Sequence, residues 1–68
     1  MRYAVVIEKA GGNYSADVPD LPGCVATGDS VASIEHEIQQ AIRFYIEGLK
    51  EDGLPIPQPT SLANYIEA

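Results

Sequence analysis

The sequence predicts a two-layer α+β domain in which an antiparallel three-stranded sheet packs on one long helix, in the order β-β-β-α. Three observations support this prediction. Two short segments with alternating apolar residues flank a glycine-rich turn, one long segment repeats its apolar residues with helical periodicity, and prolines follow that segment. The 68 residues leave room for one domain only, which we expect to span 1–68.

The three strands are expected in the first 28 residues. Residues 2–9 and 14–18 alternate apolar positions and are rich in β-branched and aromatic side chains, which is typical of strands. Between them, residues 10–13 (Ala-Gly-Gly-Asn) predict a hairpin turn, because glycine and asparagine accept the positive φ of tight turns. Two prolines and a glycine make residues 19–23 a rigid loop, and residues 24–28 can supply a short third strand.

The helix is expected to begin after Asp29 and Ser30, which have good N-cap chemistry. Gly53 is the natural residue to end it, and the prolines that follow prevent an immediate restart. Thr60 and Ser61 could then cap a short C-terminal helical turn through Leu62, Tyr65 and Ile66. One apolar stripe of the long helix should pack on the sheet: Val31, Ile34, Ile38, Ala41, Ile42, Tyr45, Ile46 and Leu49.

The chain is acidic, with ten Asp and Glu against four Lys and Arg and a net charge of −6. The four basic residues are scattered, so we expect no direct binding of nucleic acid, which needs a clustered positive patch. An acidic balance suits a basic protein partner, but on charge alone acidity for solubility is the better explanation. No signal peptide and no bilayer-spanning stretch is visible, which predicts a cytoplasmic protein without membrane contact.

No catalytic apparatus is predicted, and neither a cofactor nor a metal. Glu35, His36 and Glu37 are consecutive on a helix, so they point in different directions and cannot converge on one substrate atom. The single cysteine, Cys24, cannot form an internal disulfide and is expected to be a half-buried strand residue. Phe44 falls outside the apolar stripe of the helix; it marks either an interface or a site that the proline-rich tail covers.

Self-association is expected for two reasons. A chain this short buries only about 60% of the surface that its unfolded form exposes, so it gains from a partner subunit. One helix also covers only one face of the sheet, and the other face, with Ala4, Val6, Ser15 and Asp17, is left open. These arguments predict a homo-oligomer, either a dimer or a tetramer.

The ordered set of motifs resembles the HicB family of antitoxins over about residues 2–61. The resemblance rests on residues 12–15 (Gly-Asn-Tyr-Ser), residues 18–24 (Val-Pro-Asp-Leu-Pro-Gly-Cys) and residues 27–30 (Thr-Gly-Asp-Ser). It continues through four positions of the helix and residues 52–59, which end in Ile-Pro-Gln-Pro. The four helix positions are Ala41, Tyr45, Gly48 and Leu49.

This resemblance implies a degenerate ribonuclease-H-like domain that has lost its catalytic carboxylates. It also implies a function as an antitoxin, in which the domain neutralises HicA, a small basic ribonuclease, by covering the active site. Many members carry a C-terminal DNA-binding domain that is not expected within these 68 residues. Two alternatives stay open: an orphan self-assembling regulatory or structural domain without a toxin, and a metal-dependent nuclease, for which the strands offer only Glu8 and Asp17.

The candidate partner-binding residues fall into two groups. The first is the loop after the second strand, together with two residues of that strand, and the second consists of residues of the helix and its C-terminal end. As acids, several of them can meet basic side chains, and an interface depends on a few central anchors. The candidates are Tyr14, Asp17, Asp20, Leu21, Pro22, Gly23, Phe44, Glu47, Glu51 and Asp52.

Overall fold

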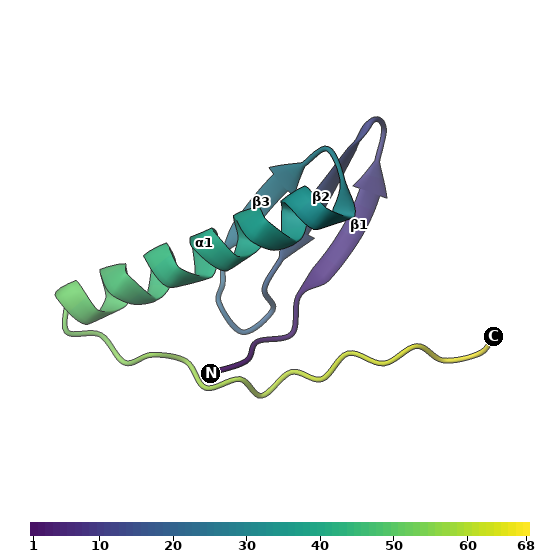
Figure 1. Cartoon of the computed structure of the whole chain (residues 1–68). Coiled ribbons are helices and arrows are strands. Elements are labelled where there is room, and N and C mark those ends of the chain that lie inside the picture. Colours follow the sequence, from purple (N-terminus) through teal and green to yellow (C-terminus); the bar gives the residue numbers. More distant parts are fainter.

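The computed structural model describes all residues 1–68 and has three strands followed by one helix (Figure 1). The strands β1 (Val6–Ala10), β2 (Asn13–Asp17) and β3 (Val25–Gly28) precede the helix α1 (Val31–Glu51). The sheet order is β1-β2-β3, and both pairings are antiparallel. The predicted β-β-β-α order and α+β class are therefore confirmed.

Two of the strands are shorter than the sequence predicts. Strand β1 begins at Val6, where an extended segment from residue 2 was expected. The reason is the partner strand: Val6 pairs with Asp17, the last residue of β2, after which the chain turns away at Pro19. Residues before Val6 thus have no backbone partner in the sheet. The turn between β1 and β2 is the expected one, with Gly11 at φ 60°.

Both ends of α1 are closed by local hydrogen bonds. Ser30 is the N-cap: its hydroxyl accepts from the amide of Ser33 at 3.1 Å, while the hydroxyl of Ser33 accepts from the amide of Ser30 at 3.2 Å. At the other end, Gly53 has φ 67° and donates to the carbonyl of Lys50, and Leu54 donates to the carbonyl of Leu49. This pair of bonds is a Schellman motif, in which the positive φ favours glycine.

The core lies between α1 and the strands β2 and β3. The helix packs mainly on β3 and β2, so that its axis is displaced from the middle of the sheet (Figure 1). Strand β1 consequently has little helix above it, and the apolar side chains on its inner face are only half-buried. Six side chains are fully buried: Ala16, Val18, Leu21, Cys24, Ile34 and Ile38.

The loop between β2 and β3 belongs to the core. Its backbone closes on itself through three hydrogen bonds of 3.0–3.1 Å. The amide of Val18 donates to the carbonyl of Cys24, the amide of Leu21 donates to the carbonyl of Val18, and the amide of Cys24 donates to the carbonyl of Leu21. This closure turns the side chain of Leu21 inward, where none of its surface is exposed. On the helix side, the hydroxyl of Tyr45 donates to the carbonyl of Pro22 at 2.9 Å.

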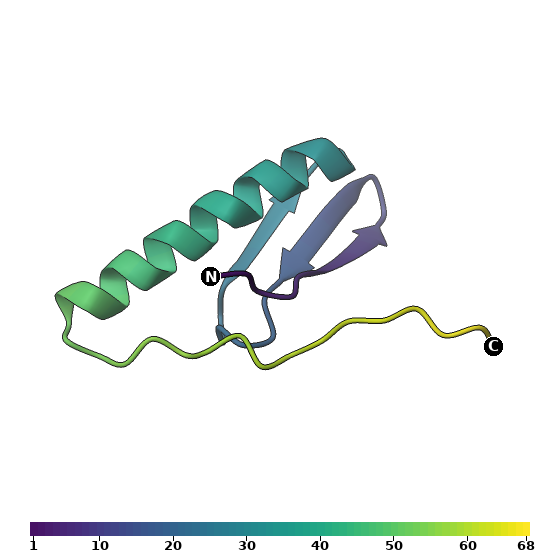
Figure 2. The same cartoon turned by 60° about the horizontal axis from the view of Figure 1, so that its bottom comes forward.

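Residues 54–68 form an extended tail that crosses beneath the sheet and passes the N-terminal segment (Figure 2). The hydroxyl of Tyr3 holds it by donating to the carbonyl of Pro57 at 2.7 Å. The predicted C-terminal helical turn is wrong, since no residue after Gly53 is helical. Thr60 and Ser61, which were expected to cap that turn, bind Asp20 with their amides and hydroxyls, and the large apolar residues beyond them are exposed.

Candidate partner-binding surfaces

Asp20 joins the β2–β3 loop to the tail, in an arrangement that we call the Asp20 clasp. Its carboxylate accepts four hydrogen bonds of 2.9–3.0 Å, two from backbone amides and two from hydroxyls, all donated by Thr60 and Ser61. The amide of Ser61 is the largest cause that lowers the pKa of Asp20, with the two hydroxyls and the Thr60 amide adding to it against a raising effect of desolvation. The clasp therefore favours the ionised carboxylate, and it places the tail beside the loop.

The loop and strand candidates do not form one surface. The side chain of Leu21 is buried in the core, and the carboxylate of Asp20 is engaged by the tail, whereas Pro22 and Gly23 are exposed. Tyr14 and Asp17 lie on opposite faces of β2: Tyr14 packs against the core, and Asp17 lies on the open face between Val6 and Val25. Of the loop candidates, only Pro22 and Gly23 are therefore exposed at the surface.

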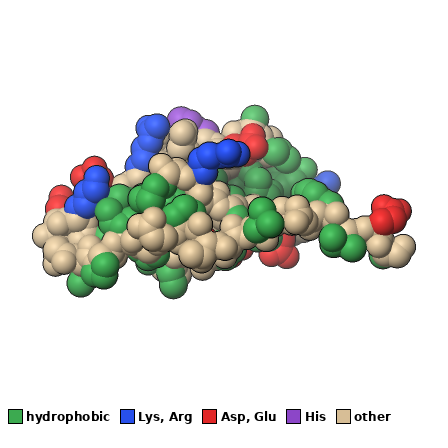
Figure 3. Space-filling view, turned by 90° about the horizontal axis from the view of Figure 1, so that it is seen from below, with side chains coloured by type: hydrophobic (Ala, Val, Ile, Leu, Met, Phe, Trp, Pro, Cys, Tyr) green, Lys and Arg blue, Asp and Glu red, His purple; other side chains and the backbone are tan.

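The helix candidates lie together more closely. Phe44 is 83% exposed, so the tail does not cover it, which was one of the two interpretations left open by the sequence. Glu47 and Glu51 are exposed and lie three and seven residues further along, on the same side of α1 as Phe44. Asp52 is the C-cap residue of the helix. Apolar side chains also show on the surface along the face seen from below, out to the end of the tail (Figure 3).

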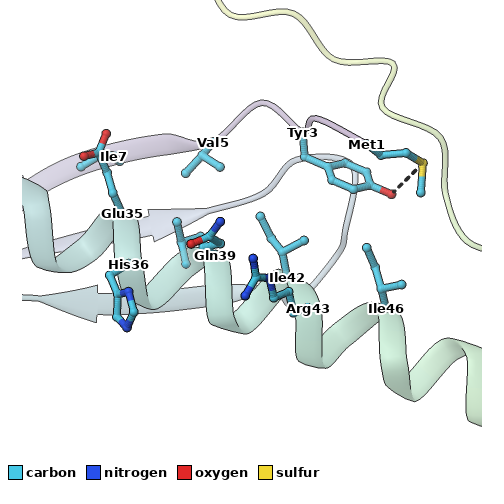
Figure 4. Close-up of a pocket in the computed structure, with 11 residues that line it drawn as sticks. Met1, Tyr3, Val5, Ile7, Glu35, His36, Gln39, Ile42, Arg43 and Ile46 are labelled. Carbon is cyan, nitrogen blue, oxygen red and sulfur yellow. Dashed lines mark hydrogen bonds between the residues drawn. The ribbon is translucent and has the colours of Figure 1, made fainter.

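Sequence reasoning missed a groove of about 850 Å³ between the start of β1 and the side of α1 (Figure 4). Its apolar floor comes from Tyr3, Val5 and Ile7, and Ile42 and Ile46 of the helix line its wall. The groove exists because α1 lies over β2 and β3 and leaves β1 uncovered. The alternation of apolar residues along the first strand predicts that one row of them faces the helix. Nothing in the sequence indicates that the helix is displaced from the middle of the sheet toward β3.

The titratable groups form no catalytic cluster. Burial raises the pKa of the Cys24 thiol, which keeps it protonated, and a protonated thiol is a poor nucleophile. Glu8 and Asp17 do share the open face of the sheet, since Glu8 pairs with Ser15 and Val6 with Asp17. No group of three or more His, Cys, Asp or Glu side chains is arranged to hold a metal ion. The single helix is also not long and apolar enough to cross a membrane.

The fold and its surfaces define a small β-β-β-α domain with an exposed aromatic residue among acids, an open sheet face and a tail fastened by a carboxylate. Residues 3–68 match the family model described as "HicB_like antitoxin of bacterial toxin-antitoxin system". The chain belongs to this family of HicB-like antitoxins.

The chain is also similar to proteins of other organisms and to a chain of a solved complex. The chain is 38% identical over 66 residues to an uncharacterised 14.9 kDa protein of Haemophilus phage HP1, covering 97% of this chain and 50% of that protein. It is 42% identical over 59 residues to a UPF0150 protein of Thermoplasma acidophilum, covering 85% of this chain and 86% of the relative. A chain in a HicA3 and HicB3 toxin-antitoxin complex superposes with a TM-score of 0.75 at 30% identity, over 87% of this chain and 69% of the other.

The two relatives differ in how much of them this chain represents. It spans half the length of the phage protein but most of the Thermoplasma protein. The domain described here is therefore found both as nearly a whole protein and as half of a longer one.

Proposed function

We propose that this chain is an antitoxin that binds a small basic HicA-like ribonuclease and neutralises it by covering the active site. The observation that carries the proposal is the family match over residues 3–68, and the likeness to a chain of the HicA3 and HicB3 complex supports it. The net charge of −6 favours association with a basic protein, because complementary potentials speed encounter and fix orientation. The proposed place of action is the cytoplasm, where such a ribonuclease would meet its RNA.

We also propose that the chain descends from ribonuclease-H-like domains but does not hydrolyse RNA. Two-metal hydrolysis of RNA needs several carboxylates that converge on the ions. Glu8 and Asp17 are the only acidic residues in the three strands, and no third ligand joins them on the open face. This geometry favours binding over catalysis.

Co-expression tests the antitoxin function. The toxin to test is a small basic HicA-like protein encoded beside this chain, expressed from an inducible promoter in a host that lacks both proteins. We expect growth arrest with the toxin alone and growth when this chain is expressed with it, together with a stoichiometric complex on gel filtration. Growth arrest that persists in the presence of well-expressed, folded chain would refute the proposal.

We also propose that the chain self-associates as a dimer or tetramer. Only six side chains are fully buried, and both the groove beside β1 and the outer face of the sheet are uncovered. Static light scattering on the isolated chain at micromolar concentration should give a mass of at least twice 7.3 kDa. A mass of one chain across that range would contradict self-association while leaving the antitoxin function untouched.

A further inference from the structure

The outer side of α1 presents one aromatic residue along an acidic stripe. Positions 37, 40, 44, 47 and 51 are spaced by three and four residues, so they lie in one row along the helix, to one side of the buried Ile34 and Ile38. The row contains Phe44, which is 83% exposed, and three glutamates, Glu37, Glu47 and Glu51. The two basic residues of the helix, Arg43 and Lys50, lie about 100° and 120° from Phe44 on the helical wheel. Of the glutamates in the row they border only Glu47, four residues before it and three residues after it, and neither has this spacing to Glu37 or Glu51.

Gly48 lies directly beside Phe44, one helical turn further on, and the fold gives no reason for a glycine there. It stands inside α1, where glycine is the least favourable residue after proline. No neighbouring atom lies within 4 Å of the position that a Cβ would occupy, and the backbone does not have a positive φ. A side chain would therefore fit in the isolated chain and would strengthen the helix.

Phe44 and Gly48 together make a projection next to a shallow notch. The aromatic ring protrudes from the helix, and the missing side chain at Gly48 lets another chain approach the helix backbone. Exposed aromatic residues are enriched among the anchors of interfaces, where they fill pockets on the partner. Both features have a use only when another molecule covers this side of the helix.

We propose that the Phe44–Gly48 side of α1 is the docking surface for the basic protein partner. In the complex, Phe44 enters an apolar pocket of the partner, a partner side chain packs over Gly48, and Lys or Arg residues around that pocket pair with Glu47 and Glu51. The inference rests on the proposed function and deepens it by naming the surface that meets the toxin.

Charge distinguishes this occupant from a second copy of the chain. In an antiparallel pairing of two such helices, Phe44 of each copy could pack over Gly48 of the other, so shape alone would permit self-association. That pairing would bring three glutamates from each copy into one small interface, where Arg43 and Lys50 border only Glu47, and each copy has a net charge of −6. A basic surface removes this repulsion, and so the partner of opposite charge is favoured.

Gly48→Ala gives the sharpest test, because its two expected effects have opposite signs. The alanine should raise the melting temperature of the isolated chain by roughly 2–8 °C, since helix propensity improves in open space. The same methyl group should weaken the complex with the HicA-like toxin by about tenfold in Kd, measured by isothermal titration. A lower melting temperature would show that the fold itself needs this glycine and would overturn the inference whether or not a toxin is in hand.

Phe44→Ala completes the test, with two matched controls. We expect the substitution to leave the melting temperature unchanged within a few degrees and to weaken toxin binding by about 30-fold or more, the loss typical of an anchor residue. Tyr65→Ala removes another exposed aromatic residue in the tail, and Gln39→Ala changes the groove side of the same helix; both should bind as the unchanged chain does.

The outcomes separate this inference from the antitoxin function. If the unchanged chain fails to bind or neutralise the toxin, the proposed function is refuted. If the unchanged chain binds and the Phe44→Ala and Gly48→Ala chains bind equally well, the antitoxin function stands and this docking surface is refuted. Light scattering gives the third result: loss of a dimer in Phe44→Ala, with toxin binding intact, would assign the surface to a second copy.

Discussion

Gly28→Ala should destabilise the domain severely, because the end of β3 lies tightly against the first turn of α1 at this glycine. A Cβ built at Gly28 lies 2.6 Å from Oγ of Ser33, 3.0 Å from the amide nitrogen of Ile34 and 3.1 Å from the Cα of Ile34. The Ser33 hydroxyl cannot simply rotate away, since it accepts from the Ser30 amide and donates to Asp29 at 3.1 Å. The other two atoms belong to the helix backbone, which can give way only by moving the first turn.

The expected loss combines two effects. Overpacking against a backbone costs about 1–3 kcal/mol, and breaking the serine capping box at the helix start adds about 1 kcal/mol. A total of about 2–4 kcal/mol corresponds to a melting temperature lowered by more than about 10 °C in a domain of this size. Circular dichroism at 222 nm, followed through urea and thermal unfolding, measures both quantities.

Two comparison variants make this prediction refutable. Gly12→Ala, where the Cβ meets no atom within 4 Å and φ is not positive, should change the free energy of unfolding by less than about 1 kcal/mol. Ser33→Ala removes the nearest clash, so the double variant Gly28→Ala, Ser33→Ala should lose less than the sum of the two single losses. A Gly28→Ala chain as stable as the Gly12→Ala chain would show that the close approach of β3 and α1 is wrong.

Three further predictions concern the loop and its contacts. Leu21→Ala should lower the free energy of unfolding by about 2–5 kcal/mol, because a fully buried side chain is lost from the core; a loss below 1 kcal/mol in urea unfolding would place Leu21 at the surface. Tyr45→Phe removes the hydrogen bond to the Pro22 carbonyl and should cost about 1 kcal/mol by the same assay, and no loss would mean that water replaces the bond fully. The Asp20 clasp should hold at neutral pH and open in acid: because its pKa lies below the ordinary 3.8, its stabilisation is complete above that value and is lost as the pH falls through the lower folded value. The amide resonances of Thr60 and Ser61 should therefore stay constant down to about pH 4 and move below it, whereas Asp20→Asn should show the opened positions at pH 7; a midpoint above pH 4 in the unchanged chain would contradict the clasp.

The strands and the helix could be predicted from sequence because each depends on neighbours in the chain. The turn at Gly11 and Gly12, the cap at Ser30 and the stop at Gly53 are local signals, and all three occur where they were expected. Periodicity also assigned the apolar positions Ile34 and Ile38 to the core. Elements whose stability is decided within a few residues are the ones that a single sequence reveals.

The errors and omissions involve residues far apart in the chain. Thr60 and Ser61 have the chemistry of a helix cap, but Asp20, 40 residues away, takes their hydrogen bonds first. Leu21 lies between two prolines of a loop, and only the backbone closure between Val18 and Cys24 turns it into the core. The candidate interface shows the same limit: Phe44 could be identified from the helical wheel, whereas the open space at Gly48 depends on how the whole domain packs around the helix.

The Asp20 clasp also bears on the order in which the chain folds. The hairpin and the helix form from contacts between near neighbours, so they can appear early, whereas the clasp has to close a loop of 40 residues. It can form only after the β2–β3 loop has taken its final shape, and it is the contact that releases first when that loop loosens. The part of the tail beyond Pro57, where Tyr3 holds it, then detaches before the sheet unfolds, which makes cleavage within residues 58–68 an early sign of a disturbed core.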